Sequence, residues 1–428
     1  MLIEFSVTNF RSIRETQTLA MSASKYYKEK LQTNSFDSGL PGLPRLLRSA
    51  VIYGPNASGK STLVMALSFM KKMVVTSAKE SQEGEKIDVM PFRLDRSTRE
   101  KESDFEIFFV EDGVRYQYGF SVQRERVLRE WMIAYPKGRP QRWFEREYDP
   151  NTGQDNYDFG ELFLGGRRRD DWKLNTRGNA LFFSTAILLN NEQLKPAFHW
   201  FQQRLRVLAP HTTLGPSYTT GICEDEETRK KVVDFLNTAD LGIADIIFEK
   251  QKLNLDEFPA DFPLVIKEEF KKNLEGKEYT EIKFIHKSNE PGDFVAFDQN
   301  DESDGTLNLF AFAGPWLDVI ENNLVLVVDE LDTSLHPLLV HHLIRLLHHD
   351  GNIKAQVIFT THDTTILGQH IMRRDQVWFM EKTSDHSTTL YPFSDFNVRE
   401  KEPWEKAYLH GRYGAIPFLR TVMLHGNE

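Results

Sequence analysis

The sequence has little of several features that would place it in other protein classes. Only one of its 428 residues is a cysteine, Cys223, which excludes an internal disulfide framework and a cysteine-rich zinc site. No apolar run approaches the ~20 residues that a membrane-spanning helix needs. The amino-terminal stretch MLIEFSVTNF has neither the basic nor the long apolar region of a signal peptide. These absences predict a cytoplasmic protein that does not contact a membrane.

An excess of positive charge and a sustained heptad repeat are missing as well. The formal net charge is −10, which argues against a surface built as a whole for nucleic acid but is compatible with a local basic patch. The densest basic cluster, Arg167–Arg169, is followed by two acidic residues and is predicted to be a solvated loop. The lack of heptads excludes long coiled-coil arms.

The chain does contain a phosphate-binding loop pattern. GPNASGKST, at residues 54–62, follows the apolar run SAVIY and precedes a stretch with helical periodicity. In this context backbone N–H groups cradle phosphate, Lys60 reaches the β- and γ-phosphates, and the Ser61 hydroxyl binds magnesium. A chance match is the alternative, and the flanking strand and helix argue against it. The predicted nucleotide-binding residues of the loop are Gly54, Pro55, Asn56, Ala57, Ser58, Gly59, Lys60, Ser61 and Thr62.

Polar residues follow two further apolar strands in the second half of the chain. Asp329 and Glu330 come directly after five apolar residues, and His362 follows the apolar run AQVIF. Asp329 is predicted to hold magnesium, and Glu330 to act as the general base on an attacking water. His362 is predicted to contact the γ-phosphate or that water. The alternatives are a helix cap for the acidic pair and a structural role for the histidine.

The order of the predicted elements indicates an α/β fold. Residues 105–122 form two alternating strands that meet at Asp112-Gly113, a hairpin within an antiparallel β lobe. Residues 190–208 and 225–241 show helical spacing, and strands and helices alternate beyond them, which predicts a mostly parallel sheet. The predicted division is an amino-terminal ATPase lobe at 1–190, a mainly helical or mixed insertion at 191–295 and a carboxyl-terminal ATPase lobe at 296–428.

The series GPNASGKST, VLVVDELDTSLHP and FTTHDT resembles the ABC-type ATPase head of SMC, Rad-fifty-type, RecF and OLD-family proteins. The resemblance implies an ABC-type P-loop NTPase head that uses ATP and Mg²⁺ and dimerises around ATP. The opening NFRSI strengthens it and implies that Arg11 and Ser12 lie near the nucleotide. In this family one subunit supplies a signature turn to the other subunit's γ-phosphate. The residues of ESDGT that match this turn are Ser303, Gly305 and Thr306.

A narrower resemblance covers essentially the whole chain. PFRLD, the DGVRYQYGFSV hairpin, FFSTAILL, ESDGT, RRDQVWFMEK and GRYGAIPFL resemble the RloA/AbiL-like bacterial ATPases of phage-defence and abortive-infection loci. This resemblance implies a sensor or scaffold that controls a separately encoded effector, such as a TOPRIM-type nuclease. His336 departs from the pattern, because an aspartate is usual at that position in transporter-type ATPases.

Three functions are therefore weighed. The first is a defence ATPase that controls an effector, the second is an SMC- or RecF-like DNA-repair ATPase that acts directly on DNA, and the third is an assembly protein gated by nucleotide binding. The negative charge and the missing coiled coil favour the first. An intrinsic nuclease is not expected, because too few residues follow TTHDT for a further domain.

Overall fold

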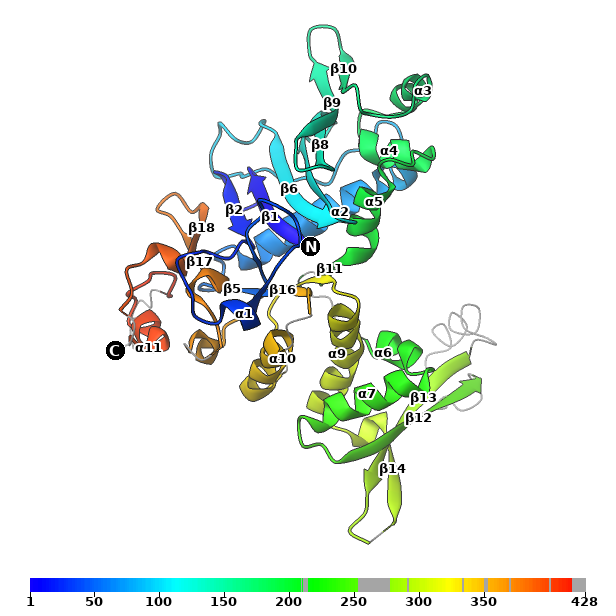
Figure 1. The fold of residues 1–428 in the computed structure, drawn as a ribbon, viewed down its shortest axis with the longest axis vertical. Coiled ribbons are helices and arrows are strands. Elements are labelled where there is room, and N and C mark those ends of the chain that lie inside the picture. Colours follow the sequence, from blue (N-terminus) through cyan, green and yellow to red (C-terminus); the bar gives the residue numbers. More distant parts are fainter. Residues whose placement is uncertain are drawn as a thin grey trace, which may run out of the picture. The chain divides into compact units, whose positions relative to one another are not determined.

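The computed structural model describes residues 1–208, 210, 215–252, 278–290, 292–332, 335–349, 353–368, 371–399 and 402–417. The chain forms two compact units (Figure 1). One combines Met1–Thr212 with Val319–Glu428, and the other is Thr213–Asp318. The predicted division into lobes at 1–190, 191–295 and 296–428 stays a prediction.

A six-stranded sheet forms the centre of the larger unit. Its order is β11-β15-β16-β5-β17-β18; the first five strands are parallel, and β18 is antiparallel to β17. Every residue of β5, β15 and β16 is buried, as expected for parallel strands covered on both faces. The predicted mostly parallel core sheet is thus confirmed. The strands are β5 (Ser49–Tyr53), β11 (Leu205–Leu208), β15 (Val325–Val328), β16 (Gln356–Thr360), β17 (Val377–Lys382) and β18 (Thr388–Pro392).

A seven-stranded antiparallel sheet forms the second layer of this unit. Its order is β10-β9-β8-β7-β6-β1-β2. The hairpin predicted at residues 105–122 is present, because Asp112 and Gly113, with φ of 48° and 73°, turn β6 into β7 with Glu111 opposite Val114. The strands are β1 (Leu2–Thr8), β2 (Gln17–Ala20), β6 (Ser103–Glu111), β7 (Val114–Val122), β8 (Val127–Tyr135), β9 (Gln141–Asp149) and β10 (Gln154–Phe159).

Helix α2 (Lys60–Glu80) packs in one hydrophobic core with residues of both sheets. Leu63, Leu67 and Met70 of this helix belong to the same buried cluster as Phe105 of β6 and Ile52 of β5. The helix begins directly after the phosphate-binding loop. Its packing therefore connects that loop to the antiparallel sheet.

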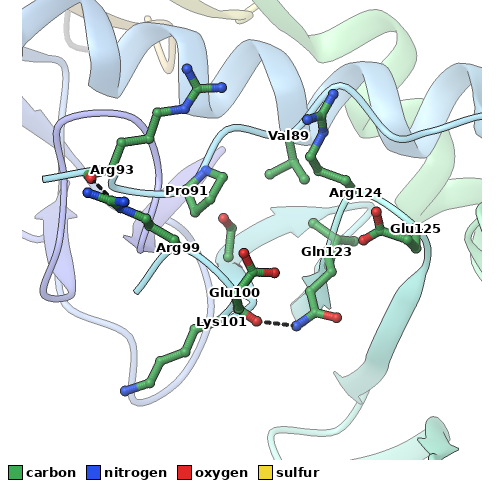
Figure 2. A pocket seen from close by; sticks show the side chains of 11 residues that line it. Val89, Pro91, Arg93, Arg99, Glu100, Lys101, Gln123, Arg124 and Glu125 are labelled. Carbon is green, nitrogen blue, oxygen red and sulfur yellow. Dashed lines mark hydrogen bonds between the residues drawn. The ribbon is translucent and has the colours of Figure 1, made fainter. Parts of the chain in front are cut away.

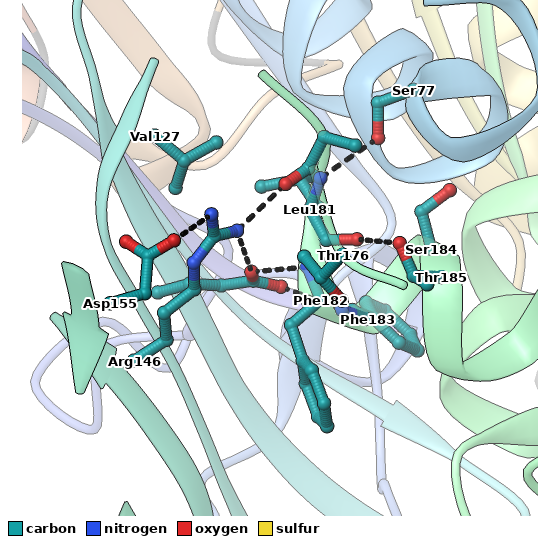
Figure 3. A network of polar contacts seen from close by, with 12 residues as sticks. Ser77, Val127, Arg146, Asp155, Thr176, Leu181, Phe182, Phe183, Ser184 and Thr185 are labelled. Atoms are coloured by element: carbon teal, nitrogen blue, oxygen red, sulfur yellow. Dashed lines mark hydrogen bonds and ion pairs between the residues drawn. The ribbon is translucent and has the colours of Figure 1, made fainter. Parts of the chain in front are cut away.

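A buried polar network holds helix α4 (Phe182–Leu188) on the antiparallel sheet (Figure 3). The Glu130 carboxylate accepts hydrogen bonds from the backbone N–H groups of Phe182 (2.6 Å) and Phe183 (2.9 Å). Arg146 lies 3.9 Å from this carboxylate and donates to the Ala180 carbonyl oxygen (2.7 Å). Glu130 and Arg146 are both fully buried. The network thus fixes the segment that leads into α4.

The last turns of α2 are joined to the same segment. The Ser77 hydroxyl accepts a hydrogen bond from the Leu181 N–H (3.2 Å), and the Ser184 hydroxyl accepts one from the Ala78 N–H (3.1 Å). Arg177 donates to the Ala78 carbonyl oxygen (2.8 Å). The end of α2 that is far from the phosphate-binding loop is therefore bound to the Arg146 network.

Two local predictions are wrong. The stretch 190–208 is not helical throughout, because after α5 (Lys195–His199) and a π-helical turn (Trp200–Arg204) the chain enters strand β11, which pairs with β15. The short run LRVL has too few residues for its periodicity to separate strand from helix. The basic cluster at 167–169 is not a loop but leads into helix α3 (Arg168–Leu174), where Trp172 is buried.

The described residues of the smaller unit form three α-helices and a three-stranded antiparallel sheet. The sheet order is β12-β13-β14, and the exposed β14 is an edge strand. The strands are β12 (Ile243–Lys252), β13 (Glu278–Lys287) and β14 (Phe294–Asp298), and the helices are α6 (Ser217–Ile222), α7 (Glu226–Asn237) and α9 (Asp304–Glu321), which ends just inside the larger unit.

The remaining elements are short, apart from the helix between β15 and β16. This helix, α10, supplies the crossover that lets the two strands run parallel. Within the described part of the chain, none of the helices combines the length and apolar character that crossing a membrane requires. The other described α-helices and β-strands are α1 (Leu31–Asn34), β3 (Ser35–Phe36), β4 (Leu46–Leu47), α10 (Pro337–His349) and α11 (Trp404–Leu409), and the 3-10 helices are Gln299–Asp301, Thr364–Leu367, Arg374–Gln376 and Phe393–Asp395.

Candidate nucleotide-binding site

The predicted site residues of the larger unit come from neighbouring parallel strands. Strand β16 lies between β15 and β5. Because all three run in the same direction, the residues that follow them meet at one edge of the sheet. The phosphate-binding loop follows β5, His362 follows β16, and Asp329 follows β15.

The loop itself needs glycine at two places. Gly59 has φ of 115°, and a Cβ added there would lie 2.3 Å from Oγ1 of Thr388. A Cβ on Gly54 would lie 2.2 Å from the Met380 carbonyl oxygen. Both close approaches involve the hairpin of β17 and β18, so this hairpin fixes the path of the loop. Ala57 also adopts a left-handed conformation, with φ of 63°.

Lys60, the first residue of α2, is only 6% exposed. Its ammonium group donates hydrogen bonds to the carbonyl oxygens of Gly54 (2.7 Å) and Pro55 (3.4 Å). Burial lowers the pKa of Lys60, and the negative charges of Asp329, Glu330 and Asp332 oppose that shift. The cation thus lies within electrostatic reach of the acidic residues after β15.

A cavity of about 400 Å³ opens beside these groups, within the range of small-molecule sites. Residues from the phosphate-binding loop, the NFRSI turn and the ends of β15 and β16 line it together. All of them are among the residues that the sequence predicts, although their roles stay predictions. The lining residues are Ser12, Pro55, Asn56, Ala57, Ser58, Gly59, Lys60, Ser61, Thr62, Glu330 and His362.

Three predicted residues of this unit are not among the lining residues. Gly54, the first residue of the loop, accepts a hydrogen bond from Lys60 through its carbonyl oxygen. Asp329 acts electrostatically on Lys60, and its side chain accepts a hydrogen bond from Thr360 (2.7 Å). Arg11 is exposed, with its guanidinium 5.7 Å from the Phe10 ring centre. The proximity of Arg11 to nucleotide therefore stays a prediction.

The remaining predicted residues, Ser303, Gly305 and Thr306, belong to the smaller unit. Ser303 precedes α9, and its hydroxyl accepts a hydrogen bond from the Thr306 N–H (3.1 Å). This is the geometry of an N-cap, which favours a helix that begins at this point. Ser303 and Gly305 are exposed, whereas Thr306 is buried. The helix start therefore presents a serine and a glycine to solvent.

Sequence reasoning missed the Thr388 hydroxyl, which lies against the phosphate-binding loop. Thr388 of β18 lies with its Oγ1 2.9 Å from Oγ of Ser12 and 2.8 Å from the Ser58 carbonyl oxygen. Ser12 in turn donates to Oγ1 of Thr62 (3.0 Å). Thr388 also receives a hydrogen bond from Lys382 (3.1 Å). The sequence carries no motif for this contact, because Thr388 is separated from Ser12 by 376 positions.

The residues present fit a magnesium ion held jointly with nucleotide oxygens. Ser61 and Asp329 offer hydroxyl and carboxylate oxygens, the ligands that Mg²⁺ prefers. Among the described side chains, no group of three or more His, Cys, Asp and Glu residues could hold a metal. Ser61 and Asp329 therefore suit an ion whose other ligands are water and phosphate oxygens better than an ion coordinated by protein side chains alone.

A second hollow, of about 550 Å³, lies beside the start of β6 and the end of β7 (Figure 2). Its lining includes the basic residues Arg93, Arg99, Lys101 and Arg124 together with the acidic Glu100 and Glu125. In Figure 2 Lys101 extends to the opposite side from Arg93 and Arg124. The lining of this hollow thus combines charges of both signs and contains no part of the phosphate-binding loop.

These strands, the loop and the polar residues at the sheet edge define an α/β P-loop ATPase head. The chain belongs to the family described as "AAA domain, putative AbiEii toxin, Type IV TA system", whose model matches residues 49–368, about three quarters of the chain. ATPases of the ABC and AAA types generally use ATP with Mg²⁺. No curated protein matches the sequence.

Several solved structures are similar to the chain at low identity. The SMC head domain from Thermotoga maritima is 15% identical and covers 91% of this chain and 98% of its own, with a TM-score of 0.39. The SmcHead bound to the C-winged helix domain of ScpA is 12% identical, with coverages of 95% and 99% and a TM-score of 0.41. The recombination mediator RecF with ATP is 14% identical, with coverages of 91% and 99% and a TM-score of 0.36. The family assignment rests on the family model alone.

Proposed function

We propose that the chain binds ATP in the 400 Å³ cavity and hydrolyses it. The observation that carries this proposal is the meeting of the phosphate-binding loop with Glu330 and His362 around one cavity. Lys60 and the N–H groups at the start of α2 bind the phosphates. Glu330 accepts a proton from the attacking water, and His362 donates a hydrogen bond to the γ-phosphate or positions that water.

We propose that magnesium binds in this cavity together with ATP. Ser61 and Asp329 would hold it, and the ion would neutralise charge on the phosphates. Asp329 is already oriented by its hydrogen bond from Thr360. Glu330, which lines the cavity, then acts on water instead of on the metal.

We further propose that a second copy of the chain closes the site. Glu330 and His362 are exposed although they line the cavity, so their side of it is open in one copy. Ser303 and Gly305 of the second copy supply the missing contacts to the γ-phosphate, and the buried Thr306, predicted to bind nucleotide as well, supports them through its hydrogen bond to Ser303. The exposed serine and glycine at the start of α9 support this arrangement, because a helix start favours a bound anion.

The proposed role of this ATPase is to act as a sensor or scaffold for a separately encoded effector, a TOPRIM-type nuclease, in anti-phage defence. The resemblance to RloA/AbiL-like ATPases supports it, and the family description names a toxin and a type IV TA system. The second candidate is an ATPase that acts directly on DNA, in the manner of SMC and RecF proteins. The net charge of −10 favours the first candidate.

Replacing Lys60 with alanine tests nucleotide binding. The variant is expected to bind ATP about 10–150-fold more weakly, because a charge-assisted hydrogen bond to phosphate contributes about 1.5–3 kcal/mol. Equilibrium titration with a fluorescent ATP analogue measures the change. Lys72→Ala, at an exposed lysine of the same helix, is the matched control and should bind like the unaltered protein. Equal affinity of both variants would contradict the assignment of the loop.

A separate experiment distinguishes the two roles. ATP turnover of the purified chain is measured with and without double-stranded DNA, and the protein encoded next to this gene is co-expressed with it. The effector role predicts an ATP turnover rate that is the same with and without DNA. It also predicts that a TOPRIM-like protein encoded by the adjacent gene co-purifies with the chain. Turnover strongly stimulated by DNA in the chain alone would favour the second candidate.

A further inference from the structure

Thr360, the last residue of β16, joins the two acidic residues of the candidate site. It is fully buried. Its hydroxyl donates a hydrogen bond to Oδ1 of Asp329 (2.7 Å) and accepts one from the backbone N–H of Glu330 (2.7 Å). Its carbonyl oxygen accepts a third bond, from the Leu331 N–H (3.0 Å). One residue therefore contacts three consecutive positions of the turn that follows β15.

The backbone of this turn needs such support. Glu330 has φ of 53°, in the left-handed region that residues other than glycine rarely adopt and that costs about 1–3 kcal/mol. A conformation of this kind persists only where surrounding contacts hold it. The Thr360 hydroxyl is bonded to the N–H of Glu330 itself. It thereby fixes the backbone position from which the Glu330 side chain reaches the cavity.

A second contact holds the same two segments together. The N–H of His362 donates to Oδ2 of Asp332 (3.2 Å). The segment that follows β16 is thus bound to the turn after β15 both at Thr360 and at His362. Thr360 differs from His362 in that it is buried behind the acidic pair, whereas His362 lines the cavity.

We propose that Thr360 is a positioning residue for ATP hydrolysis, which orients Asp329 as a magnesium ligand and Glu330 as the general base. The inference rests on the proposed ATPase function and adds a residue that does not touch the nucleotide. A hydroxyl is required because it has one hydrogen to donate and lone pairs that accept, and it uses both here. Valine has nearly the same shape and offers neither.

The central variant is Thr360→Val. It leaves Oδ1 of Asp329 without its donor and the Glu330 N–H without its acceptor in a buried place. Loss of a residue that hydrogen-bonds to a metal ligand and orients it typically lowers activity or metal affinity by about 10–100-fold. We expect kcat to fall by about that factor and the Mg²⁺ concentration for half-maximal rate to rise, while ATP affinity changes less than about threefold. Thr360→Ser, which keeps the hydroxyl, should restore most of the rate.

Thr361 offers a matched control. It is the next residue and equally buried, and its hydroxyl also accepts a backbone hydrogen bond, from Asp363 (3.0 Å). Thr361→Val therefore also removes a buried hydrogen bond and lowers the stability of the fold, but it removes no hydrogen bond to the turn at 329–331. Its kcat should stay within about threefold of the unaltered protein. If Thr360→Val does not fold, as judged by ATP binding, then Thr360→Ala takes its place with the same expectations.

Combining the change with Glu330→Gln shows whether Thr360 acts through Glu330. Once the base is lost, Thr360→Val should lower kcat by much less than it does alone, since interacting residues are not additive. The inference is overturned if the Thr360 and Thr361 variants have equal kcat, or if the two losses multiply fully. An unaltered protein that does not hydrolyse ATP would overturn the proposed function itself. If only the inference about Thr360 is wrong, the unaltered protein still hydrolyses ATP, and Glu330→Gln still slows that hydrolysis.

Discussion

Replacing Glu330 with glutamine is expected to slow ATP hydrolysis by a factor of about 10²–10⁴ while ATP stays bound. General-base catalysis by a positioned carboxylate contributes that much, and an amide of the same shape cannot accept the proton. The side chain lines the cavity, but Glu330 lies outside the phosphate-binding loop that is proposed to bind the phosphates. The loss should therefore appear in kcat and leave ATP affinity nearly unchanged. Phosphate release at saturating ATP and titration with a fluorescent analogue measure the two quantities separately.

The control for this change is Glu80→Gln, at the exposed end of α2. It removes the same charge from the same unit, far along the helix from the loop, and should leave turnover unaltered. A Glu330→Gln protein that turns over within about threefold of the unaltered chain would show that another group is the base. A loss of ATP affinity equal to the loss of rate would instead indicate a binding role.

The same variant should trap the proposed dimer. With hydrolysis slowed, ATP is expected to hold two copies together at about twice the 49.8 kDa of one chain, as measured by light scattering after gel filtration. Gly305→Arg in this background should prevent the dimer, because it places a large side chain at the exposed start of α9. Glu290→Arg, in the exposed turn before β14, adds the same side chain to the same unit and should not. A dimer that forms in both double variants would exclude the start of α9 from the interface.

The sequence predicts the edge of the central sheet well, for a physical reason. Each of the three runs SAVIY, LVLVV and AQVIF is mostly apolar and is followed by a glycine or by polar residues, which is typical of buried parallel strands. Because parallel strands end at one edge, this pattern predicts that Lys60, Glu330 and His362 lie at the same edge of the sheet, but not that their strands are neighbours. The observed strand order, with β16 between β15 and β5, agrees with that reasoning.

Other parts could not be predicted, because they depend on contacts between distant positions. Strand β11 has four residues, and its pairing with β15 decides its conformation. Thr360 carries no motif of its own, and its importance follows only from the hydrogen bonds to Asp329 and Glu330. Arg146 lies between two glutamates in the run RWFERE, where the sequence does not mark it as a core residue; the structure buries Arg146 completely. Periodicity predicts which residues can face a core, but not which charged residue will be enclosed.

That buried arginine carries the second large expected effect. Arg146→Met should lower the free energy of unfolding by about 3–5 kcal/mol, because it leaves the buried Glu130 carboxylate without a compensating charge. Arg146 is 3.9 Å from Glu130 and also donates to Asp155 (2.9 Å) and to the Ala180 carbonyl oxygen (2.7 Å). Methionine fills much of the volume but satisfies none of these groups. Urea unfolding followed by tryptophan fluorescence measures the loss.

Arg129→Met is the matched control on the neighbouring strand. Arg129 pairs with Glu145 at 2.5 Å, but its side chain is 52% exposed. Solvent screens such a pair, so the expected loss is about 0–1 kcal/mol. Equal destabilisation by the two variants would show that the buried network contributes no more than a surface ion pair, and would contradict its role in holding α4 on the sheet.

The penalty of Arg146→Met should also depend on pH in a defined direction. Burial raises the pKa of Glu130 above its ordinary value of 4.5, while Arg146 and the N–H groups of Phe182 and Phe183 oppose that rise. Without Arg146 the pKa rises further, and the folded state then binds a proton that the unfolded state releases. Stability therefore falls as pH increases from 4.5 through the raised pKa, and the variant recovers part of its loss in acid. A penalty that is constant between pH 5 and pH 8 would show that Glu130 does not titrate in the variant.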